Sequence, residues 1–529
     1  MKIKFQRVVP ALLVALAIGS CKKSVDDVVV PPPVVNVLDT SAPLKSAASF
    51  TIGAAVPYGE MINNAAYAAI VKRDFSGITI ENDMKHGSVV QANGSLNFTR
   101  ADALINAAQG LTIFGHTLGW HTQQNATYLK TFAGINSASG PELSTNGGFE
   151  SGLTGWSVLN TNGATITAGS GAIEVRTGSG SMKVANPTAW PGNQWRVQVS
   201  SATFPTVVGR QYVVSYYAKA EAAGGSIRLS TGPTNPSYQG DQTIGTNWQL
   251  ITFTFTAAVA SSTFLFDLGQ VANTYYIDDV SVKEISQSSG AQVSAKLDEA
   301  LGNFVTGMVT HFKGRVKAWD VVNELFTESG ALRNNSNTPT TNADVLVWSH
   351  YLGRDYAFKA FNYAAAADPA ALLFINDYNL EQSPAKLDSL IAYVREIKLR
   401  GAKVDGIGTQ MHVHANSNRA MIDLMMQKLA ATGLLVRISE LDISVNPAST
   451  AGYQFTATEA ANQSEVYRYI VGSYMKNIPK AQQHGITVWG ITDNTSWLYK
   501  NGLDFPLLYN ANYTKKPAFT GFLRGLKGL

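Results

Sequence analysis

Short apolar stretches of strand character alternate with longer segments of helical periodicity along most of the chain. The strand candidates are rich in Val, Ile, Leu and Phe, as is typical of strands buried on both faces of a parallel sheet. They are TIGAAV (51–56), FSGITIEN (75–82), LTIFGHTLGW (111–120), VKAWDVVNE (316–324), LLFINDYN (372–379), DGIGTQMHV (405–413), LVRISELDI (435–443) and GITVWGITD (485–493). Helical spacing falls between them, in ADALINAAQ (101–109), AKLDEALGNFVTGMVTHF (295–312), SPAKLDSLIAYVREIKLRG (383–401) and ANQSEVYRYIVGSYMKNI (461–478).

One interval, residues 137–288, interrupts this alternation. Its helical patterns disappear, and short alternating strands are separated by turns rich in Gly, Thr, Asn and Ser, which is typical of an antiparallel sandwich. These strands are WRVQVS (195–200), YVVSYYAKA (212–220), SIRLS (226–230), LITFTFTA (250–257), STFLFDLG (262–269) and YYIDDVSVKEI (275–285).

Eight strand candidates, most of them followed by a helix, predict a (β/α)8 TIM barrel. We therefore expect an α/β fold in which this barrel, residues 47–136 and 289–529, is interrupted after its third strand by an all-β, jelly-roll-like sandwich, residues 137–288. A doubly wound open sheet is the structural alternative, but no glycine-rich phosphate loop follows an early strand.

The N-terminus has the pattern of an exported protein. Residues 1–20 combine the basic MKIKFQR with an apolar stretch too short for a permanent membrane helix, which predicts a signal peptide. The tetrapeptide Ile18-Gly19-Ser20-Cys21 resembles the lipobox of bacterial lipoproteins, in which the cysteine becomes lipidated. An ordinary signal peptide with an incidental cysteine is the alternative. Residues 21–46, with prolines at 31–33, predict a Pro-rich linker.

Composition narrows the class of protein. The chain has 529 residues, 45% of them hydrophobic and 15% charged, which favours a globular protein of two domains. The net charge of +4 includes three cations of the predicted signal peptide, so nothing favours a nucleic-acid partner. Cys21 is the only cysteine, and the fold must therefore stand without disulfides.

Two glutamates close apolar strand candidates. Glu324 ends VKAWDVVNE and Glu440 lies near the end of LVRISELDI. Partial burial at a strand end favours the protonated form of a carboxylic acid, which is what a proton donor requires. Two carboxyl groups at two strand ends predict a two-carboxylate reaction, of which glycoside hydrolysis is the best-known example.

Other polar and aromatic residues also lie toward the C-terminal ends of the strands, where barrel enzymes hold their active sites. A single buried His or Trp is more often an ordinary core residue, but a converging set favours a site. The set comprises Glu81, Asn82, Asp83, Lys85, His116, Trp120, His121, Asn323, Gln410, His412, Asp442, Trp489, Asp493 and Trp497.

Several of these segments together resemble the motif set of glycoside hydrolase family 10, typified by endo-β-1,4-xylanases. The resemblance extends from about Ile52 to about Phe522, apart from the insert. The segments are WDVVNE (319–324), ISELDI (438–443), HTLGWH (116–121), ENDMK (81–85), TQMH (409–412) and TVWGITDNTSWL (487–498).

The resemblance implies a role for each matched residue. Glu324 is the general acid/base and Glu440 the nucleophile of a retaining mechanism, with about 5–5.5 Å between the two carboxyl groups. Asn323 hydrogen-bonds the sugar 2-hydroxyl, and His412 orients the nucleophile with Asp442 as its partner. The expected substrate contacts are polar at Asn82, Lys85, His116 and Gln410 and aromatic at Trp120, Trp489 and Trp497.

The sequence departs from the family pattern at two positions. His86 stands where the family commonly has Trp after the ENDMK run, and Tyr128 stands where another Trp is expected. We expect neither residue to touch the two glutamates, so these departures affect affinity at outer subsites and leave the reaction intact.

The ends of the insert resemble carbohydrate-binding modules of families 4, 9 and 22. They are ELSTNGGFESGLTGW (142–156) and YYIDDVSVKE (275–284). Trp190, Trp195 and Tyr238 are the candidate ligand-binding aromatics because they lie in or beside loops rich in Gly, Pro and Asn, with core packing as the alternative. Asp278 and Asp279 are candidates for a structural calcium, although solvated turn carboxylates are the simpler reading.

We thus expect an exported, lipid-anchored bacterial endo-β-1,4-xylanase that acts on xylan or arabinoxylan as a monomer. No cofactor or catalytic metal is expected, and the anchor leads to the outer membrane, at the cell surface or its periplasmic face. An endoglucanase or mixed-specificity enzyme on the same scaffold is the first alternative. The second is a non-catalytic surface glycan-binding lipoprotein.

Overall fold

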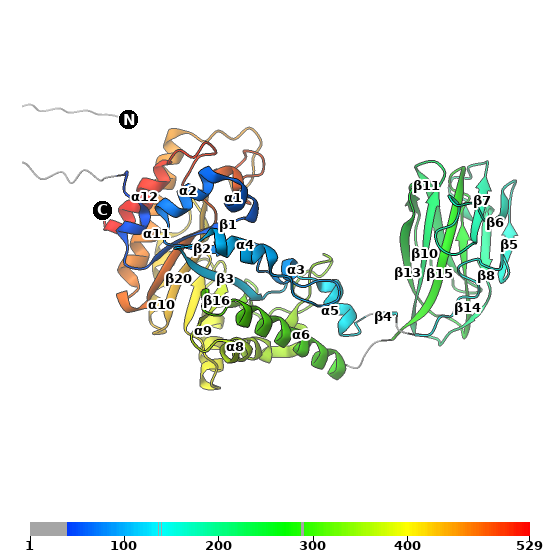
Figure 1. Ribbon diagram of the computed structural model, residues 1–529, viewed down its shortest axis with the longest axis horizontal. Coiled ribbons are helices and arrows are strands. Elements are labelled where there is room, and N and C mark those ends of the chain that lie inside the picture. Colours follow the sequence, from blue (N-terminus) through cyan, green and yellow to red (C-terminus); the bar gives the residue numbers. More distant parts are fainter. Residues whose placement is uncertain (1–39, 136, 139, 287–289) are drawn as a thin grey trace, which may run out of the picture. The chain divides into compact units, whose positions relative to one another are not determined.

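The computed structural model describes residues 40–135, 137–138, 140–286 and 290–529 (Figure 1). The predicted signal peptide, Cys21 and most of the predicted linker lie outside these described residues. The linker was expected to run to residue 46, but Leu44–Ala47 form a 3-10 helix, η1, in which Leu44 is fully buried. This helix contacts helix α12 (Pro517–Lys527) because an apolar side chain after the prolines finds a place in the core.

The first folded part is a closed parallel barrel. Pairing of β18 with β20 completes the circle, which confirms the predicted barrel and excludes the doubly wound open sheet. The sixth strand position is divided at Met411, which has a φ of 63°. The strands are β1 (Thr51–Val56), β2 (Gly77–Ile80), β3 (Thr112–Gly119), β16 (Val316–Asn323), β17 (Leu372–Asp377), β18 (Gly406–Thr409), β19 (His412–His414), β20 (Leu435–Ser444) and β21 (Gln483–Val488).

The register between β3 and β16 depends on a close approach. Trp319 on β16 pairs with Gly115 on β3, and a Cβ on Gly115 would lie 2.1 Å from the Trp319 indole. Only glycine fits there, so the fully buried indole locks the two strands together. This register brings the carboxyl end of β16, and with it Glu324, level with the ends of the neighbouring strands.

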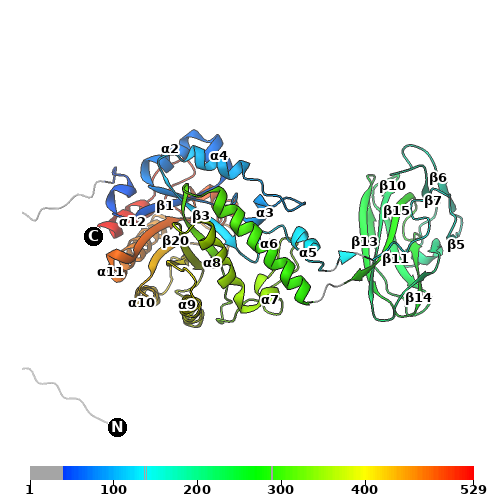
Figure 2. The ribbon, with the colours of Figure 1, turned by 60° about the horizontal axis from the view of Figure 1, so that its bottom comes forward.

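The α-helices surround the strands, as Figure 2 shows. Local signals define several ends: a capping box of Thr456 and Glu459 starts α11, and Ser383 caps α9 ahead of Pro384. Beside α12, the helices are α1 (Tyr58–Asn63), α2 (Ala65–Asp74), α3 (His86–Val89), α4 (Thr99–Ala107), α5 (Ala126–Phe132), α6 (Gly290–His311), α7 (Trp348–Leu352), α8 (Tyr356–Ala367), α9 (Pro384–Leu399), α10 (Arg419–Ala430) and α11 (Ala457–Asn477). Short 3-10 helices are η3 (Gly353–Asp355), η4 (Lys480–Gln482) and η5 (Asp493–Thr495).

The second folded part is an antiparallel β-sandwich, which is inserted in the sequence between α5 and α6. The barrel is therefore interrupted after its third strand, as predicted. One sheet has the order β13-β10-β15-β7-β6, and the other has the order β12-β11-β14-β8-β5. The strands are β4 (Ser137–Ala138), β5 (Trp156–Asn160), β6 (Thr165–Gly169), β7 (Ser181–Asn186), β8 (Gln198–Ser201), β9 (Phe204–Pro205), β10 (Gln211–Ala220), β11 (Gly225–Gly232), β12 (Gln242–Ile244), β13 (Gln249–Thr256), β14 (Ser261–Asp267) and β15 (Asn273–Ser286), with the 3-10 helix η2 (Gln194–Arg196).

Alternation of side chains along the strands builds the sandwich core. Tyr212, Val214, Tyr216 and Ala218 of β10 are buried, while the residues between them are partly exposed. At the base of the sandwich, β4 pairs with the end of β15, so the two ends of the insert run side by side. Among the described residues, no helix has the length and apolarity needed to cross a membrane.

Candidate active site

A cleft of about 590 Å³ opens at the carboxyl ends of the barrel strands. All the barrel residues predicted to catalyse the reaction or bind substrate line this one cleft, although they come from six different strand positions and the loops that follow them. They are Asn82, Lys85, His116, Trp120, Asn323, Glu324, Gln410, His412, Glu440, Asp442, Trp489 and Trp497.

Glu440, on β20, is a buried carboxylate held by hydrogen-bond donors. Its Oε1 accepts a hydrogen bond of 2.8 Å from Asn376 Nδ2, and His412 Nε2 lies 3.2 Å from its Oε2. Burial raises the pKa of Glu440, but the hydrogen bond from His412 and the charge of His116 outweigh burial and hold the pKa below its usual range. Glu440 is therefore ionised at neutral pH, as a nucleophile must be.

His412 links Glu440 to a second carboxylate. Its Nδ1 lies 2.9 Å from Asp442 Oδ2, which also accepts a hydrogen bond of 2.9 Å from Trp497 Nε1. Burial lowers the pKa of His412, but the charges of Asp442 and Glu440 outweigh burial and raise the pKa to about 10. The ring is therefore an imidazolium whose two N–H groups face two carboxylates.

Replacing His412 by Asn is expected to move the acid limb of the kcat/KM profile to higher pH. The imidazolium lowers the pKa of Glu440, so its loss lets that pKa rise, and more acid protonates the nucleophile at a given pH. A charge-assisted hydrogen bond corresponds to a shift of about one pH unit or more. The measurement is kcat/KM from pH 3 to 8, with Asp442→Asn as the control expected to shift less. An unmoved acid limb would contradict the assignment.

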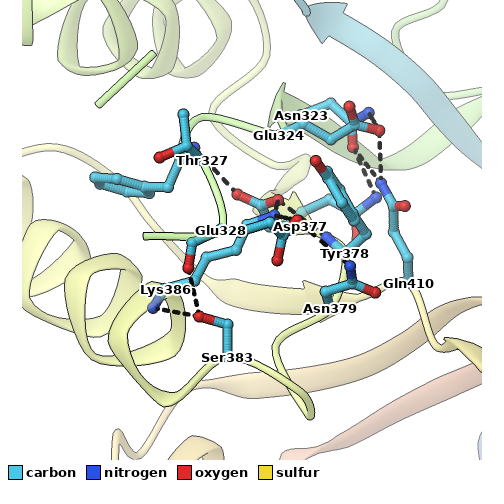
Figure 3. A network of polar contacts seen from close by, with 12 residues as sticks. Asn323, Glu324, Thr327, Glu328, Asp377, Tyr378, Asn379, Ser383, Lys386 and Gln410 are labelled. Carbon is cyan, nitrogen blue, oxygen red and sulfur yellow. Dashed lines mark hydrogen bonds and ion pairs between the residues drawn. The ribbon is translucent and has the colours of Figure 1, made fainter. Parts of the chain in front are cut away.

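Glu324 immediately follows β16 and has a positive φ of 55°, uncommon for a non-glycine residue. Its backbone N–H donates to Asn376 O at 2.9 Å, which ties the residue to the end of β17. Its Oε1 accepts hydrogen bonds from Asn323 Nδ2 at 3.2 Å and Gln410 Nε2 at 3.1 Å (Figure 3). The acid thus faces two neutral amides, whereas Glu440 faces an imidazolium.

The wall of the cleft next to Glu324, from the ends of β2 and β3, carries a buried cation. Lys85 is 5% exposed, donates to Asn82 Oδ1 at 3.0 Å, and lies 5.0 Å from the centre of the Trp120 ring. Burial lowers the pKa of Lys85. His116 Nδ1 lies 3.0 Å from Asp320 Oδ2, and both residues are buried. Donors beside an aromatic face suit the hydroxyl edge and apolar face of a sugar.

The two departures from the family pattern lie away from the glutamates. His86 is buried, its Nδ1 accepts a hydrogen bond of 3.1 Å from the Asn125 backbone, and its ring is 4.8 Å from that of Phe304. Burial lowers the pKa of His86 to about 3, so the ring is neutral. Tyr128 stacks on Phe132 within α5. Neither residue lines the cleft.

Among the residues of the site that the sequence analysis missed, two that contact or lie beside the glutamates belong to the fifth strand segment, LLFINDYN. Asn376 donates to Glu440 and also to Asn323 Oδ1 at 2.9 Å, so it couples the two halves of the site. Tyr378 lines the cleft beside Glu324. The available signal was the run of polar residues after FI at a strand end, which is the same signal that identified Glu324.

The sandwich has a candidate ligand-binding surface of its own. Trp195 and Tyr238 are 46% and 57% exposed, whereas Trp190 packs against the sandwich core. Between the two exposed rings, paired positions on four adjacent strands form a polar row of Arg228, Asp267, Gln198 and Asn160. Arg228 lies 4.9 Å from the Tyr238 ring and donates to Asp267, and Asn160 donates to Trp195 O.

The calcium suggested for Asp278 and Asp279 does not fit their surroundings. Asp278 Oδ2 accepts hydrogen bonds from the backbone of Arg176 and Thr177, and Asp279 accepts from their side chains. These oxygen atoms already face N–H and O–H donors and a guanidinium, which leaves them unsuited to a cation. Across the described parts of the chain, no group of three or more His, Cys, Asp and Glu side chains could hold a metal.

Comparisons with known proteins agree with this geometry. The family model Glycosyl hydrolase family 10 matches residues 42–146 and 280–524, more than half of the chain. The model Carbohydrate binding domain matches residues 141–269, which overlap the end of the first segment and stop before the second begins. Endo-beta-1,4-xylanase Xyn10C of Cellvibrio japonicus is 38% identical over 246 residues, which cover 43% of this chain and 40% of that protein.

Endo-1,4-beta-xylanase A of Cellvibrio japonicus (strain Ueda107) is 34% identical over 250 residues, covering 44% of this chain and 41% of that protein. The match thus spans about two fifths of the length of either relative. The solved structure of native xylanase 10C from Cellvibrio japonicus has a TM-score of 0.56 at 24% identity, covering 92% of this chain and 72% of that chain. At this identity the likeness shows the fold. On the family match, the chain belongs to glycosyl hydrolase family 10, with a carbohydrate-binding domain inserted into its barrel.

Proposed function

We propose that this chain is a retaining endo-β-1,4-xylanase. The observation that carries the proposal is the contrast between two carboxyl groups in one cleft: that of Glu440 is held ionised by an imidazolium, and that of Glu324 accepts hydrogen bonds only from neutral amides in the described residues. The names of the two Cellvibrio relatives support xylan as the substrate.

In the first step, the Glu440 carboxylate attacks the anomeric carbon and forms a glycosyl ester, while the glycosidic C–O bond breaks. Glu324 gives its proton to the departing oxygen. In the second step, Glu324 removes a proton from water, which attacks the anomeric carbon and releases Glu440. Asn376 and His412 keep one oxygen atom of Glu440 each in a fixed position, so the other lone pairs remain directed into the cleft.

Selection of xylose over glucose is assigned to the tryptophans on the eighth strand and its loop. Xylose lacks the hydroxymethyl group of glucose, and indole bulk beside that position rejects glucose by a clash. Trp489 is 9% exposed and therefore held in place, and Trp497 is tied to Asp442 by its indole N–H. Both side chains are fixed enough to act as walls.

Product analysis tests the function. The protein is incubated with arabinoxylan, carboxymethyl cellulose and mannan, and the anomeric form of the first products is followed by proton NMR. The proposal expects short xylo-oligosaccharides that appear first as the β-anomer. Cleavage of carboxymethyl cellulose instead would indicate an endoglucanase. Binding without cleavage of any of these glycans would indicate a non-catalytic glycan-binding protein.

The sandwich is proposed to hold xylan near the cleft and so raise its local concentration. The polar row described above, flanked by Trp195 and Tyr238, supports this role, because planar polar groups between exposed rings match a sugar chain.

Alanine at Trp195 or Tyr238 is expected to weaken retention of the full chain on insoluble xylan by about tenfold, the scale of one aromatic contact. The measurement is a depletion isotherm on washed xylan, with thermal unfolding to establish that each variant folds. Trp248→Ala is the matched control, since Trp248 lies next to β13 in the other sheet. Equal retention of all three variants would contradict the assignment of this face.

The N-terminal segment is proposed to export the protein and anchor it through a lipid on Cys21 at the outer membrane. The sequence Ile18-Gly19-Ser20-Cys21 supports the proposal, and the prolines that follow provide a spacer. Incorporation of labelled palmitate, followed by membrane fractionation, tests it. A protein that carries no label and stays in the soluble fraction would contradict the anchor.

A further inference from the structure

A lysine and an aspartate form an ion pair buried behind the wall of the cleft. Lys386 Nζ lies 2.9 Å from Asp377 Oδ1, and both side chains have no exposed surface. Lys386 belongs to the first turn of α9, and Asp377 ends β17, directly after Asn376 of the site (Figure 3). Neither residue lines the cleft.

The pair joins three segments of the chain. Asp377 accepts hydrogen bonds from the backbone N–H of Tyr378 at 3.0 Å and of Phe326 at 3.3 Å, so it connects β17 with the loop after β16. Lys386 brings α9 to the same point and reaches Glu328 Oε1 at 3.5 Å. The loop after β16 begins with Glu324, and the pair thus supports the segment that holds the acid.

Tyr378 is clamped between two cations. Lys386 Nζ lies 3.3 Å from the centre of the Tyr378 ring, and Arg333 Nη2 donates to the Tyr378 hydroxyl at 2.8 Å. Arg333 Nε also donates to Glu324 O at 2.8 Å. A cation against a desolvated ring is worth more than one at the surface. The Tyr378 ring is therefore held relative to Glu324 by Lys386 against its face and by Arg333 at its hydroxyl group.

The position of Tyr378 in the cleft indicates which sugar of the substrate lies beside its ring. Lys85, Trp120 and His116 come from the ends of β2 and β3, on one side of Glu324 in the barrel, whereas Tyr378 follows β17 on the other side. If the first side holds the sugar that Glu440 attacks, the second side receives the sugar that leaves with the proton of Glu324.

Stability alone does not explain the pair. Removing two charges from water costs several kcal/mol per ion, and a buried pair is often replaceable by apolar residues without loss. The cost is visible at Asp377, where burial raises the pKa to about 6 in spite of the lysine. The pair thus costs free energy of desolvation, and it contacts both Tyr378 and the loop that begins with Glu324. Its role is therefore to fix the positions of these two parts of the site.

We propose that Lys386 and Asp377 are positioning residues that hold Tyr378 and the Glu324 loop in place for the leaving-group sugar. The inference rests on the proposed glycosidase function. It assigns no proton transfer to either residue: the pair acts through Tyr378, whose ring provides the platform on which the departing sugar stacks.

The test compares two substrates of the full-length protein. Xylotetraose has a sugar as its leaving group, whereas 4-nitrophenyl β-xylobioside has a phenolate. The double variant D377N/K386M removes both charges with little change in volume, and thus avoids the unpaired buried aspartate that K386M alone would leave. We expect its kcat/KM to fall about tenfold more for xylotetraose than for the aryl substrate, the scale of one desolvated cation–π contact. Tyr378→Ala should give the same pattern, and adding it to the double variant should lower kcat/KM no further.

The matched control is D493N/K516M. Lys516 and Asp493 form another buried pair of 2.9 Å, behind the eighth strand, and its loss should not separate the two substrates. Parallel loss on both substrates in D377N/K386M, or no loss, would overturn the inference.

A crystal structure of D377N/K386M tests the same point without any substrate, since the Tyr378 ring should leave its place above residue 386. An unmoved ring would refute the positioning role. A wild-type protein that cleaves neither substrate would contradict the proposed function, while this structural outcome would still decide the role of the pair.

Discussion

Glu440→Ala is expected to abolish hydrolysis of xylan, with kcat/KM lower by about 10⁴- to 10⁶-fold. The variant has no nucleophile to form the glycosyl ester, and a water in its place is not ionised at neutral pH. The loss should be equal for arabinoxylan and for an activated aryl xylobioside, because both reactions pass through the same ester. The measurement is initial rates on both substrates.

Covalent trapping identifies the same residue directly. A 2-deoxy-2-fluoro xylobioside with a good leaving group should label the wild-type protein at Glu440, as peptide mass spectrometry can show. The variant should remain unlabelled. Glu381→Ala is a suitable control, since Glu381 is another buried glutamate that lies outside the cleft lining. A label on any other residue, or a Glu440→Ala variant within tenfold of wild type, would contradict the assignment.

Glu324→Ala is expected to separate substrates by their leaving groups. Hydrolysis of xylan needs a proton on the departing sugar oxygen and should fall by about 10²- to 10⁴-fold, the contribution of general acid catalysis. Formation of the ester from 4-nitrophenyl xylobioside needs little acid help, because the phenolate leaves unaided. The second step still lacks its base, so the ester should accumulate and produce a burst of nitrophenol.

Azide distinguishes this role from simple damage to the site. A small anion can occupy the space left by the carboxylate and attack the ester without a base, so azide should restore turnover of the aryl substrate and yield a β-xylobiosyl azide. Gln410→Ala serves as the comparison, because it removes a hydrogen bond to Glu324 and leaves the carboxylate present. Azide that gave no rescue, or equal losses on both substrates, would contradict the role of Glu324 as acid/base.

The barrel could be predicted from the sequence because its signals are local. Each strand is a run of apolar residues flanked by turn residues, and the fold follows from their order. Leu44 was misassigned because burial of one apolar residue after a Pro-rich stretch depends on η1 meeting α12, at the other end of the chain. A contact over such a separation leaves no pattern in the local sequence.

The candidate site was only partly predictable for the same reason. Strand ends that carry polar residues identify which side chains gather at the cleft, and all the barrel residues predicted to catalyse the reaction or bind substrate line it, whereas Asp83, His121 and Asp493 of the wider strand-end set do not. The partners of those side chains depend on the register of neighbouring strands. Asn376 bridges Asn323 and Glu440 across three strands, and Asp377 pairs with Lys386 at a helix start. The polar run after the fifth strand marks Asn376 and Asp377 as strand-end residues, but it does not identify these partners.

The same limit applies to the sandwich. Trp190 and Trp195 lie five positions apart in a stretch of uniform composition, yet one packs on the core and the other, in η2, is nearly half exposed. Composition cannot separate them, because the difference depends on how each ring packs on the folded strands, and Arg196 lies over both rings alike. The chemical roles of all these residues remain predictions that the variants above test.

The pairing of β4 with β15 has a consequence for how the chain folds during synthesis. The ribosome releases the first three barrel strands long before β16, with the whole sandwich between them. A flexible segment of that length would add to the entropy that barrel closure must overcome. Once the sandwich has folded, its ends run side by side at Ala138 and Ile285, so the points where the chain enters and leaves the insert are held close together. The inserted domain thereby shortens its own effective loop, and the barrel strands before and after it can pair almost as if the chain had not been interrupted.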